Sequence, residues 1–361
     1  MKPILELLRP TITGIGSVTP YGTLAGLIPP SHVEPIPITA WATEGLRRAF
    51  QVQPFQPSSV VPGLKIRRLD RLSAWALVAA SLALQDAGID LNQLDRTRVA
   101  VVFATGFGCI ELTESFYQSA FANGWAGTDP ITFPETLTNS PAGHVALFHN
   151  LQGPNITVSS KHFAAESALL QAASLLRHGQ ADLAVVIAGD TLTQTMYAWY
   201  ETAQLLSAAC FGDESSSKTS GFVPSEGVVA LVLETTENSK QTAKRTACSY
   251  AHLHTGRWAS GGEPMEPVRQ MLDGSIPSLL ICAGNGAPCD TSPTLNLARS
   301  LVGANSVATV LPAQPAALGV TDAGALLHLV LALSSQPERG LAVQFSTSGK
   351  SGYAALLLEI P

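Results

Sequence analysis

The sequence predicts a layered α/β protein, and two observations carry this prediction. Short apolar runs rich in β-branched residues recur along the chain, and segments with the apolar spacing of helices lie between them. Such alternation is typical of layered α/β folds. Runs that are apolar on both faces indicate central strands covered by helices on each side. The predicted strands are Val99–Ala104, Ala184–Ala188, Val228–Leu233, Leu279–Ala283, Val307–Leu311, Ala342–Phe345 and Ala354–Ile360.

Three helices are predicted along the chain. The first is Arg71–Ala87, with Asp70 as its N-cap and Gly88 as its stop. The second is Phe163–His178, and the third, rich in Ala and Leu, is Thr321–Ser334. The first helix precedes the predicted strand Val99–Ala104 and the other two fall between predicted strands, so strands and helices alternate as in a layered fold.

The two halves of the chain follow a similar succession of strand, loop, Ala/Leu-rich helix and strand, which indicates a duplicated unit. The least patterned stretch, Glu237–Ser278, is expected to bridge the halves. We therefore expect an N-terminal half at residues 1–236 and a shorter C-terminal half at 237–361.

The chain is poor in charge. Of its 361 residues 13% are charged, against about 25% in an average soluble domain, and the net charge is −6. Interface cores are depleted in charge, so we expect another subunit to cover part of the surface. A net acidic chain without a basic cluster argues against nucleic acid as the main partner. No apolar run reaches the roughly 18 residues of a membrane span, and the first residues lack the apolar core of a signal peptide. A cytoplasmic protein without a membrane partner is expected.

Motifs for cofactors and metals are incomplete. The glycine pairs Gly14-Ile15-Gly16 and Gly106-Phe107-Gly108 lack the third glycine of a dinucleotide fingerprint. The five cysteines form no C-x-x-C pair, and the eight histidines form no H-E-x-x-H pattern. We expect neither a cofactor nor a metal.

Five separated segments occur in a characteristic order: residues 13–20 (TGIGSVTP), 68–73 (RLDRLS), 139–143 (NSPAG), 153–160 (GPNITVSS) and 221–227 (GFVPSEG). In sequence and order they resemble the β-ketoacyl synthase family, the condensing enzymes of fatty acid and polyketide assembly. The resemblance covers most of residues 11–235 and weakens after 240. It implies a thiolase-like α-β-α-β-α architecture built from two duplicated halves, with mixed central sheets.

The resemblance also implies where the family's catalytic residues would lie, and this chain has other residues there. The family's nucleophilic cysteine starts a buried helix, whose N-terminus favours the thiolate. Its S-S-A-C-A motif falls on 159–163, which places His162 at the cysteine. The family's first histidine falls on Gly284, its second histidine on Leu318, and its lysine on Gln314. The chain is therefore expected not to condense acyl groups by itself.

Degenerate ketosynthases of this kind resemble the chain-length factors of type II polyketide and aryl polyene synthases. This resemblance implies a heterodimer with an active ketosynthase, served by an acyl carrier protein. Segments Ile110–Phe121 and Ile131–Leu137 are implied to reach across to the partner and to shape the acyl tunnel. The alternative is that their aromatic residues are ordinary core. The implied interface strand is Asn155, Ile156, Thr157, Val158, Ser159 and Ser160, and the implied tunnel residues are Phe116, Tyr117, Phe133 and Leu137.

Two roles are open for His162. It could be a general base in an enzyme of changed chemistry, a malonyl decarboxylase or an acyltransferase. Alternatively, it is a neutral imidazole that fills the vacated nucleophile pocket. Lys161 would favour the neutral ring if both side chains point inward. Glu166, one helical turn further on, could instead hold the ring and favour the imidazolium. For the whole chain, a homodimeric scaffold without an acyl-chain role is a third alternative.

Overall fold

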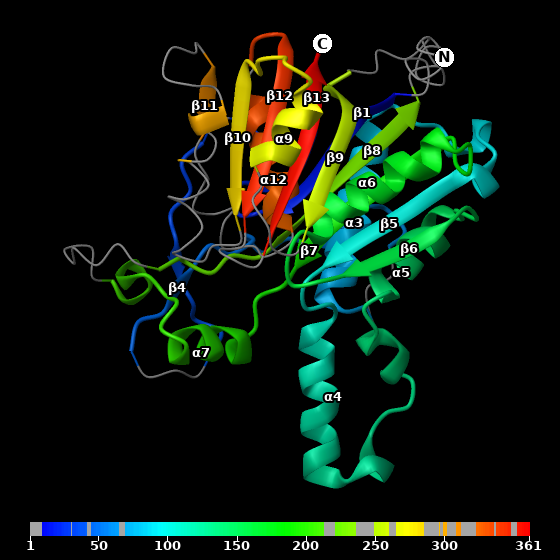
Figure 1. Cartoon of the computed structure of the whole chain (residues 1–361). Coiled ribbons are helices and arrows are strands. Elements are labelled where there is room, and N and C mark those ends of the chain that lie inside the picture. Colours follow the sequence, from blue (N-terminus) through cyan, green and yellow to red (C-terminus); the bar gives the residue numbers. More distant parts are fainter. Residues whose placement is uncertain are drawn as a thin grey trace.

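The computed structural model describes residues 9–29, 31–41, 45–64, 69–212, 221–235, 249–259, 265–284, 296, 299–301, 308–311, 323–335, 337–347 and 352–361. Within these residues, eleven strands form one continuous mixed sheet (Figure 1). In addition, β3 (Ile36–Pro37) and β4 (Arg48–Ala49) form a small antiparallel pair.

The first half of the sheet has the strand order β6-β5-β7-β8-β1. β5 is parallel to β6 and β7, whereas β8 is antiparallel to β7 and β1. A short strand, β2 (Gly22–Ala25), pairs with β1. The bounds are β1 Pro10–Thr19, β5 Val99–Thr105, β6 Asn155–Ser159, β7 Leu183–Asp190 and β8 Gly227–Thr235.

The second half repeats this arrangement, with the order β11-β10-β12-β13-β9. β10 is parallel to β11 and β12, and β13 is antiparallel to β12 and β9. The halves join where β1 pairs with β9. The predicted duplication is thus visible in strand order and direction. The bounds are β9 Ala251–Ala259, β10 Leu279–Gly284, β11 Thr309–Leu311, β12 Gly340–Thr347 and β13 Tyr353–Ile360.

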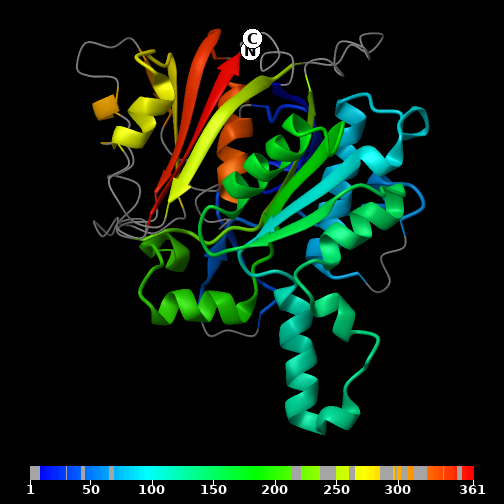
Figure 2. The ribbon, with the colours of Figure 1, turned by 45° about the vertical axis from the view of Figure 1, so that its right-hand side comes forward.

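Helices fill the layers between and outside the half-sheets (Figures 1 and 2). In the central layer, α6 and α12 share one hydrophobic core with both half-sheets. α3 and α5 cover the outer face of the first half, and α9 covers the outer face of the second. This gives the predicted α-β-α-β-α layering. The bounds are α2 Pro57–Val60, α3 Arg71–Asp86, α4 Ile110–Asn123, α5 Ser140–His149, α6 Ala164–Arg177, α7 Gln194–Thr202, α9 Met265–Leu272 and α12 Ala323–Ser334, with single 3₁₀ turns η1 Leu91–Gln93, η2 Arg96–Arg98, η3 Trp125–Gly127, η4 Phe133–Thr136 and η5 Ala208–Phe211.

The outer-layer helix α3 packs directly on β1 through two glycines. A Cβ at Gly14 would lie 2.2 Å from the carbonyl oxygen of Ala83, and one at Gly16 would lie 2.1 Å from that of Ala79. Only glycine permits this approach. The Gly14-Ile15-Gly16 pair is therefore explained by helix–strand packing.

The stretch Glu237–Ser278, which was expected to be a bridge, contains β9 and α9, both of which belong to the second half. That expectation was wrong for these two segments. The proposed boundary at 236/237 falls among residues outside the described ranges and stays a prediction.

A projection, here called the arm, comprises residues 110–139 and contains α4, η3 and η4. It extends away from the sheet at the end where β5 and β6 finish (Figure 1, bottom). Its single fully covered helical residue is Ala120, so the arm is anchored at its base and uncovered along its length.

Candidate functional site

The site at His162 lies where β6 turns into α6. The Ser160 N–H still donates to the Thr105 carbonyl of β5 (3.2 Å), and α6 begins at Ala164. Between them Phe163 adopts the left-handed conformation (φ 61°, ψ 23°). This conformation is uncommon for a bulky residue and concentrates at functional sites. The chain therefore makes a sharp turn, and His162 lies before the helix instead of on it.

His162 lies on the surface of the chain, where it lines a pocket. Its backbone is fixed by Ser160, whose hydroxyl donates to the His162 carbonyl (2.9 Å). The imidazole is exposed in this chain and lines a pocket, so the interpretation that it fills the vacated nucleophile pocket stays a prediction.

Glu166 points the other way, into the central layer. Its carboxylate accepts a hydrogen bond from the Ser346 hydroxyl of β12, and the residue is 3% exposed. Burial raises the pKa of this carboxyl. The alternative in which Glu166 holds the His162 ring is not supported, because this carboxylate joins the two halves.

The Lys161 side chain packs against the face of the Phe107 ring. Its ammonium lies 3.3 Å from the centroid of the Phe107 ring, a close cation–π contact. Phe107 is itself held by β7: the Asp190 carboxylate accepts from the N–H of Phe107 (2.9 Å), the N–H of Gly106 and the Thr105 hydroxyl. This packing thus fixes a positive charge beside His162.

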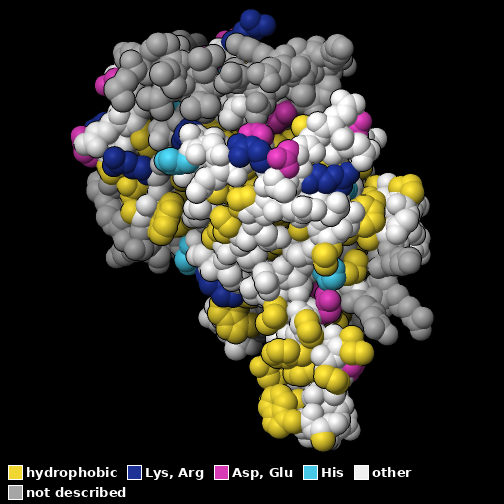
Figure 3. All heavy atoms as spheres, turned by 90° about the vertical axis from the view of Figure 1, so that its right-hand side faces the viewer, with side chains coloured by type: hydrophobic (Ala, Val, Ile, Leu, Met, Phe, Trp, Pro, Cys, Tyr) yellow, Lys and Arg dark blue, Asp and Glu magenta, His cyan; other side chains and the backbone are white. Residues whose placement is uncertain are grey.

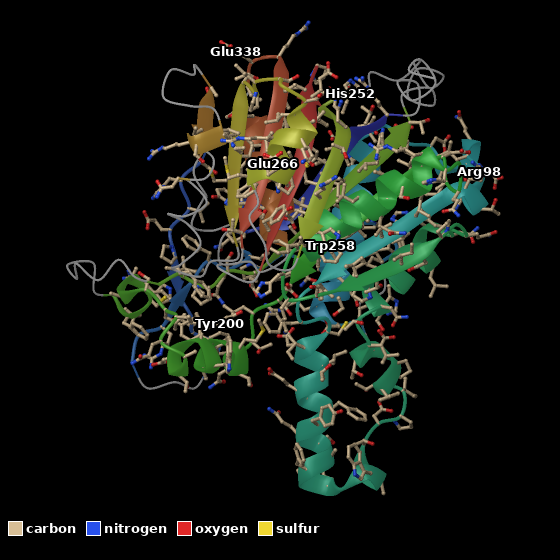
Figure 4. All side chains as sticks on the ribbon, in the orientation of Figure 1. Arg98, Tyr200, His252, Trp258, Glu266 and Glu338 are labelled. Atoms are coloured by element: carbon tan, nitrogen blue, oxygen red, sulfur yellow. The ribbon has the colours of Figure 1, made fainter. Side chains whose placement is uncertain are left out.

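Lys161 and His162 line a pocket of about 660 Å³. Apart from these two, its walls are mainly apolar and come from the start of α4 (Ile110) and from α7 (Met196, Trp199, Tyr200). Figure 4 labels Tyr200 on α7, at the end of the sheet from which the arm projects. A volume of roughly 300–1,000 Å³ is usual for a small-molecule site.

A second polar element ties the arm's base to α7. The Thr193 hydroxyl donates to the carboxylate of Glu114 (2.8 Å) and also accepts from the N–H of Met196 as the α7 cap (3.2 Å). Glu114 thus lines the pocket while already holding a donor.

Arg71 anchors the arm to α3 from behind the pocket. It donates to Glu111 of α4 (2.9 Å), to the Leu192 carbonyl (3.0 Å) and to Glu226 (3.1 Å). Glu226 is buried, which raises the pKa of its carboxyl against the lowering effect of Arg71. This network gives the GFVPSEG segment a structural role.

The described cysteines are poor nucleophiles. Cys109, Cys210 and Cys282 are free and buried. Burial raises the pKa of Cys109 well above its usual range and the pKa values of Cys210 and Cys282 to about 11. These thiols therefore stay protonated at neutral pH, and a protonated thiol is a weak nucleophile.

Of the other replaced positions, Gly284 lies at the end of β10, paired with Thr347 of β12. Ser346, which precedes Thr347 on β12, forms a hydrogen bond with Glu166 in the first turn of α6. Gly284 therefore lies at the same end of the molecule as His162. The positions Leu318 and Gln314 lie outside the described residues.

The predicted tunnel residues lie on the arm and do not line the His162 pocket. Tyr117, Phe133 and Leu137 are 48%, 53% and 46% exposed, and Phe116 is half-buried against Phe133 with ring centroids 5.8 Å apart. The alternative that the aromatic residues among them are ordinary core of this chain was wrong for Tyr117 and Phe133. Other exposed apolar residues of the arm are Phe121, Trp125 and Ile131, and Figure 3 shows the apolar surface gathered there.

The predicted interface strand is an edge strand. β6 pairs with β5 on one side, and no strand of the described ranges lies on its other side. The Pro154 carbonyl and the Ser160 N–H bond to β5. Because the bonding side alternates along a parallel strand, the N–H and C=O groups of Asn155, Thr157 and Ser159 face the open edge. Beside it, Leu147 of α5 is 79% exposed.

The pocket wall formed by α7 was not predicted from the sequence. The sequence does carry a signal for this wall, since Met196–Tyr200 contains three aromatic residues in a chain that is 6% aromatic.

In the described part of the chain, none of the helices is long and apolar enough to cross a membrane. The same residues contain no group of three His, Cys, Asp or Glu side chains placed to hold a metal ion.

Comparison with known families gives a match to the β-ketoacyl synthase N-terminal domain over residues 42–239, more than half of the chain. The 3-oxoacyl-[acyl-carrier-protein] synthase 2 of Coxiella burnetii is 27% identical over 262 residues, covering 69% of this chain and 62% of the relative. Nodulation protein E of Rhizobium leguminosarum bv. trifolii is 28% identical over 239 residues, covering 64% and 59%. The chain thus spans about three fifths of the length of these curated relatives.

Solved structures match over nearly the whole chain. The ishigamide ketosynthase/chain length factor superposes with a TM-score of 0.73 at 20% identity, covering 98% of this chain and 99% of the other. A β-ketoacyl synthase from Burkholderia phymatum STM815 gives 0.76 at 18% identity with the same coverage. A type II PKS ketosynthase in complex with its acyl-carrier protein also gives 0.76, at 16% identity. At such identities these likenesses show the shared fold.

Proposed function

The chain belongs to the β-ketoacyl synthase family, and we propose that it acts there as a chain-length factor. In this role it pairs with an active ketosynthase of a type II polyketide or aryl polyene synthase and shapes the acyl tunnel, without condensing acyl groups itself. The observation that carries the proposal is the uncovered apolar arm beside the open edge of β6, on a chain with His162 at the nucleophile position.

The chemistry supports a non-catalytic role. The family's reaction needs a thiolate to hold the acyl chain as a thioester. His162 offers an imidazole in its place, Gly284 offers no side chain where a histidine would assist, and the described cysteines are buried and protonated. A working condensing centre must therefore come from the partner.

The open edge of β6 and the exposed arm support a partner of the same family. An edge strand with its backbone groups turned outward is a template for pairing with another strand, and charges are absent from Asn155–Ser159. The arm extends beyond its own sheet, so its exposed rings face whatever chain pairs with β6. Phe116, Tyr117, Phe133 and Leu137 would then line a tunnel that runs between the subunits and would set its depth.

The proposed complex receives its growing chain from an acyl carrier protein. One structural neighbour is a ketosynthase bound to its acyl-carrier protein, and we extend that partnership to the complex and not to this chain alone. The low charge of the chain fits a surface that the ketosynthase covers.

A second candidate is an enzyme of changed chemistry, a malonyl decarboxylase or an acyltransferase that uses His162. The observation that favours it is the exposed imidazole beside the fixed ammonium of Lys161, at the mouth of a pocket. Incubation of the chain alone with malonyl-loaded carrier protein separates the candidates: turnover that His162→Ala abolishes supports the second and contradicts the first.

Co-expression with a ketosynthase that carries an intact Cys–His–His set tests the pairing. We expect a one-to-one complex. Thr157→Pro should weaken it by about tenfold or more, since it removes an outward N–H worth about 1 kcal/mol and the ring blocks close approach. Thr157→Val keeps the N–H and serves as the matched control. A stable homodimer that ignores the ketosynthase, or equal binding by both variants, would contradict the proposed pairing.

A further inference from the structure

A second pocket is built mainly from the second half of the molecule and shares no described lining residue with the pocket at His162. Its walls come from β10, β11 and α12, which lie together in that half (Figure 1), and from the turns before and after β2. Its volume is about 180 Å³. An apolar cavity of about 150 Å³ holds one benzene molecule. The pocket therefore has room for a single six-membered ring with a small substituent.

The pocket lies at a joint between the two halves of the chain. Tyr21 and Ile28, which flank β2 of the first half, face the pocket together with Ile281 of β10 and Leu331 of α12. The joint is fixed beside the pocket, because the Ile28 N–H donates to the Ser334 hydroxyl at the end of α12 (3.0 Å). A molecule bound in this pocket would contact both halves.

The described lining residues carry no formal charge at neutral pH. None of them is Asp, Glu, Lys or Arg. The histidine among them, His328, is 2% exposed, and burial lowers the pKa of its imidazole to about 4. Its Nδ1 donates to the Gly324 carbonyl (2.8 Å), as a neutral ring can. An ion would lose its hydration here and gain no opposite charge from these walls, so the pocket favours a neutral molecule.

The polar groups of the pocket include three hydroxyls, and two of them are already engaged as donors. Ser334 and Ser335 donate to the α12 carbonyls of Val330 and Ala332, both at 2.7 Å. Tyr21 is half-buried, and burial raises the pKa of its phenol, so the hydroxyl keeps its proton at neutral pH. This hydroxyl forms no hydrogen bond with the described residues. It can therefore donate to or accept from a bound molecule.

We propose that this pocket binds a simple phenol, a neutral single ring with one hydroxyl group, with the ring against Ile281 and Leu331 and the hydroxyl bonded to Tyr21. An apolar hollow with a few polar groups is the general form of a small-molecule site. Binding is reversible and forms no covalent bond. The site belongs to this chain whether or not a ketosynthase pairs with it.

The test uses the full chain and calorimetric titration with three probes of similar shape. They are p-cresol, p-xylene, in which a methyl group replaces the hydroxyl, and p-toluate, in which a carboxylate replaces it. p-Cresol should bind saturably at millimolar concentration, and p-toluate should bind at least tenfold more weakly. Tyr21→Phe removes one hydroxyl and should weaken p-cresol binding about threefold to tenfold. The same variant should leave p-xylene binding within twofold, which also shows that its pocket is folded.

Two further variants separate this pocket from the one at His162. Leu331→Trp fills the pocket and should abolish p-cresol binding, and its denaturant midpoint, close to that of the parent chain, should show that it is folded. Thr195→Trp, at an exposed position of α7 that lines the His162 pocket, is the matched control and should leave p-cresol binding within twofold.

Four results would overturn the proposal. They are the absence of saturable p-cresol binding, p-toluate binding as tight as that of p-cresol, a Tyr21→Phe variant that does not weaken p-cresol relative to p-xylene, and p-cresol binding that survives Leu331→Trp. Loss of p-cresol binding in Thr195→Trp would likewise place the phenol in the His162 pocket and contradict the assignment. None of these outcomes depends on whether a ketosynthase co-purifies.

Discussion

The most exposed aromatic residue of the arm gives a quantitative test of whether the proposed partner covers the arm. Phe121 is 84% exposed and contacts Tyr117, with ring centroids 6.4 Å apart. Full burial of a phenylalanine stabilises by about 1.5–3 kcal/mol, so covering this fraction contributes about 1.3–2.5 kcal/mol. Phe121→Ala should therefore weaken the complex with a ketosynthase about 10-fold to 70-fold. In the chain alone the same substitution should change the free energy of unfolding by less than about 0.5 kcal/mol.

The assay is the dissociation constant of the purified complex, measured beside denaturant unfolding of the chain alone. Ile276→Ala is the matched control, because Ile276 is 73% exposed but precedes β10 in the other half. It should change neither quantity. A Phe121→Ala complex as tight as the Ile276→Ala complex would refute the reasoning, since the arm would then stay in solvent when the partner binds.

Three further predictions concern the products, the site and the fold. Phe116→Trp and Phe133→Trp should shorten the products of the reconstituted complex, read by mass spectrometry, because larger rings reduce the tunnel depth; unchanged lengths for both would remove these residues from the tunnel. His162→Ala should leave the condensation rate of the complex within about twofold, and a large loss would favour the second candidate function. Burial raises the pKa of Asp70 from 3.8 to about 6, and the Leu72 N–H lowers it by a smaller amount. The folded state therefore binds this proton more tightly than the unfolded chain does. The stability that protonated Asp70 contributes is lost as the pH rises from about 4 through 6. Asp70→Asn keeps the helix cap and does not titrate in this range. The free energy of unfolding of this variant, relative to that of the parent chain, should therefore rise by up to about 3 kcal/mol between pH 4 and pH 7. Denaturant titrations that show no such rise would contradict this assignment.

Much of the fold could be predicted because central strands and capped helices leave local signals. Asp70 caps α3 as predicted, accepting from the Leu72 N–H (2.9 Å). The apolar runs at β5, β7 and β8 are buried along their whole length. β9 was missed because one of its faces is polar: Ala251 and Leu253 are buried while His252 and His254 are half-buried. A strand of this kind shows alternation and no continuous apolar run.

The site was harder to predict for geometric reasons. Glu166 follows His162 by four residues, a spacing that pairs side chains only within a helix. The left-handed Phe163 ends that relation, because it places His162 outside α6. On the arm, aromatic residues at helical spacing look the same in sequence whether they are buried in a core or exposed at an interface. Their exposure depends on the direction of α4, which extends away from the sheet (Figure 1).

The central claim is that this chain supplies surface and tunnel while another subunit supplies the chemistry. Its most direct test is to measure chain elongation by this chain alone, by a cysteine-bearing ketosynthase alone, and by the two after co-purification, together with the subunit ratio of the active species. We predict a one-to-one complex that elongates, and no elongation by this chain alone. Elongation by this chain without a partner, or activity of the ketosynthase with unchanged product length when this chain is left out, would contradict the claim.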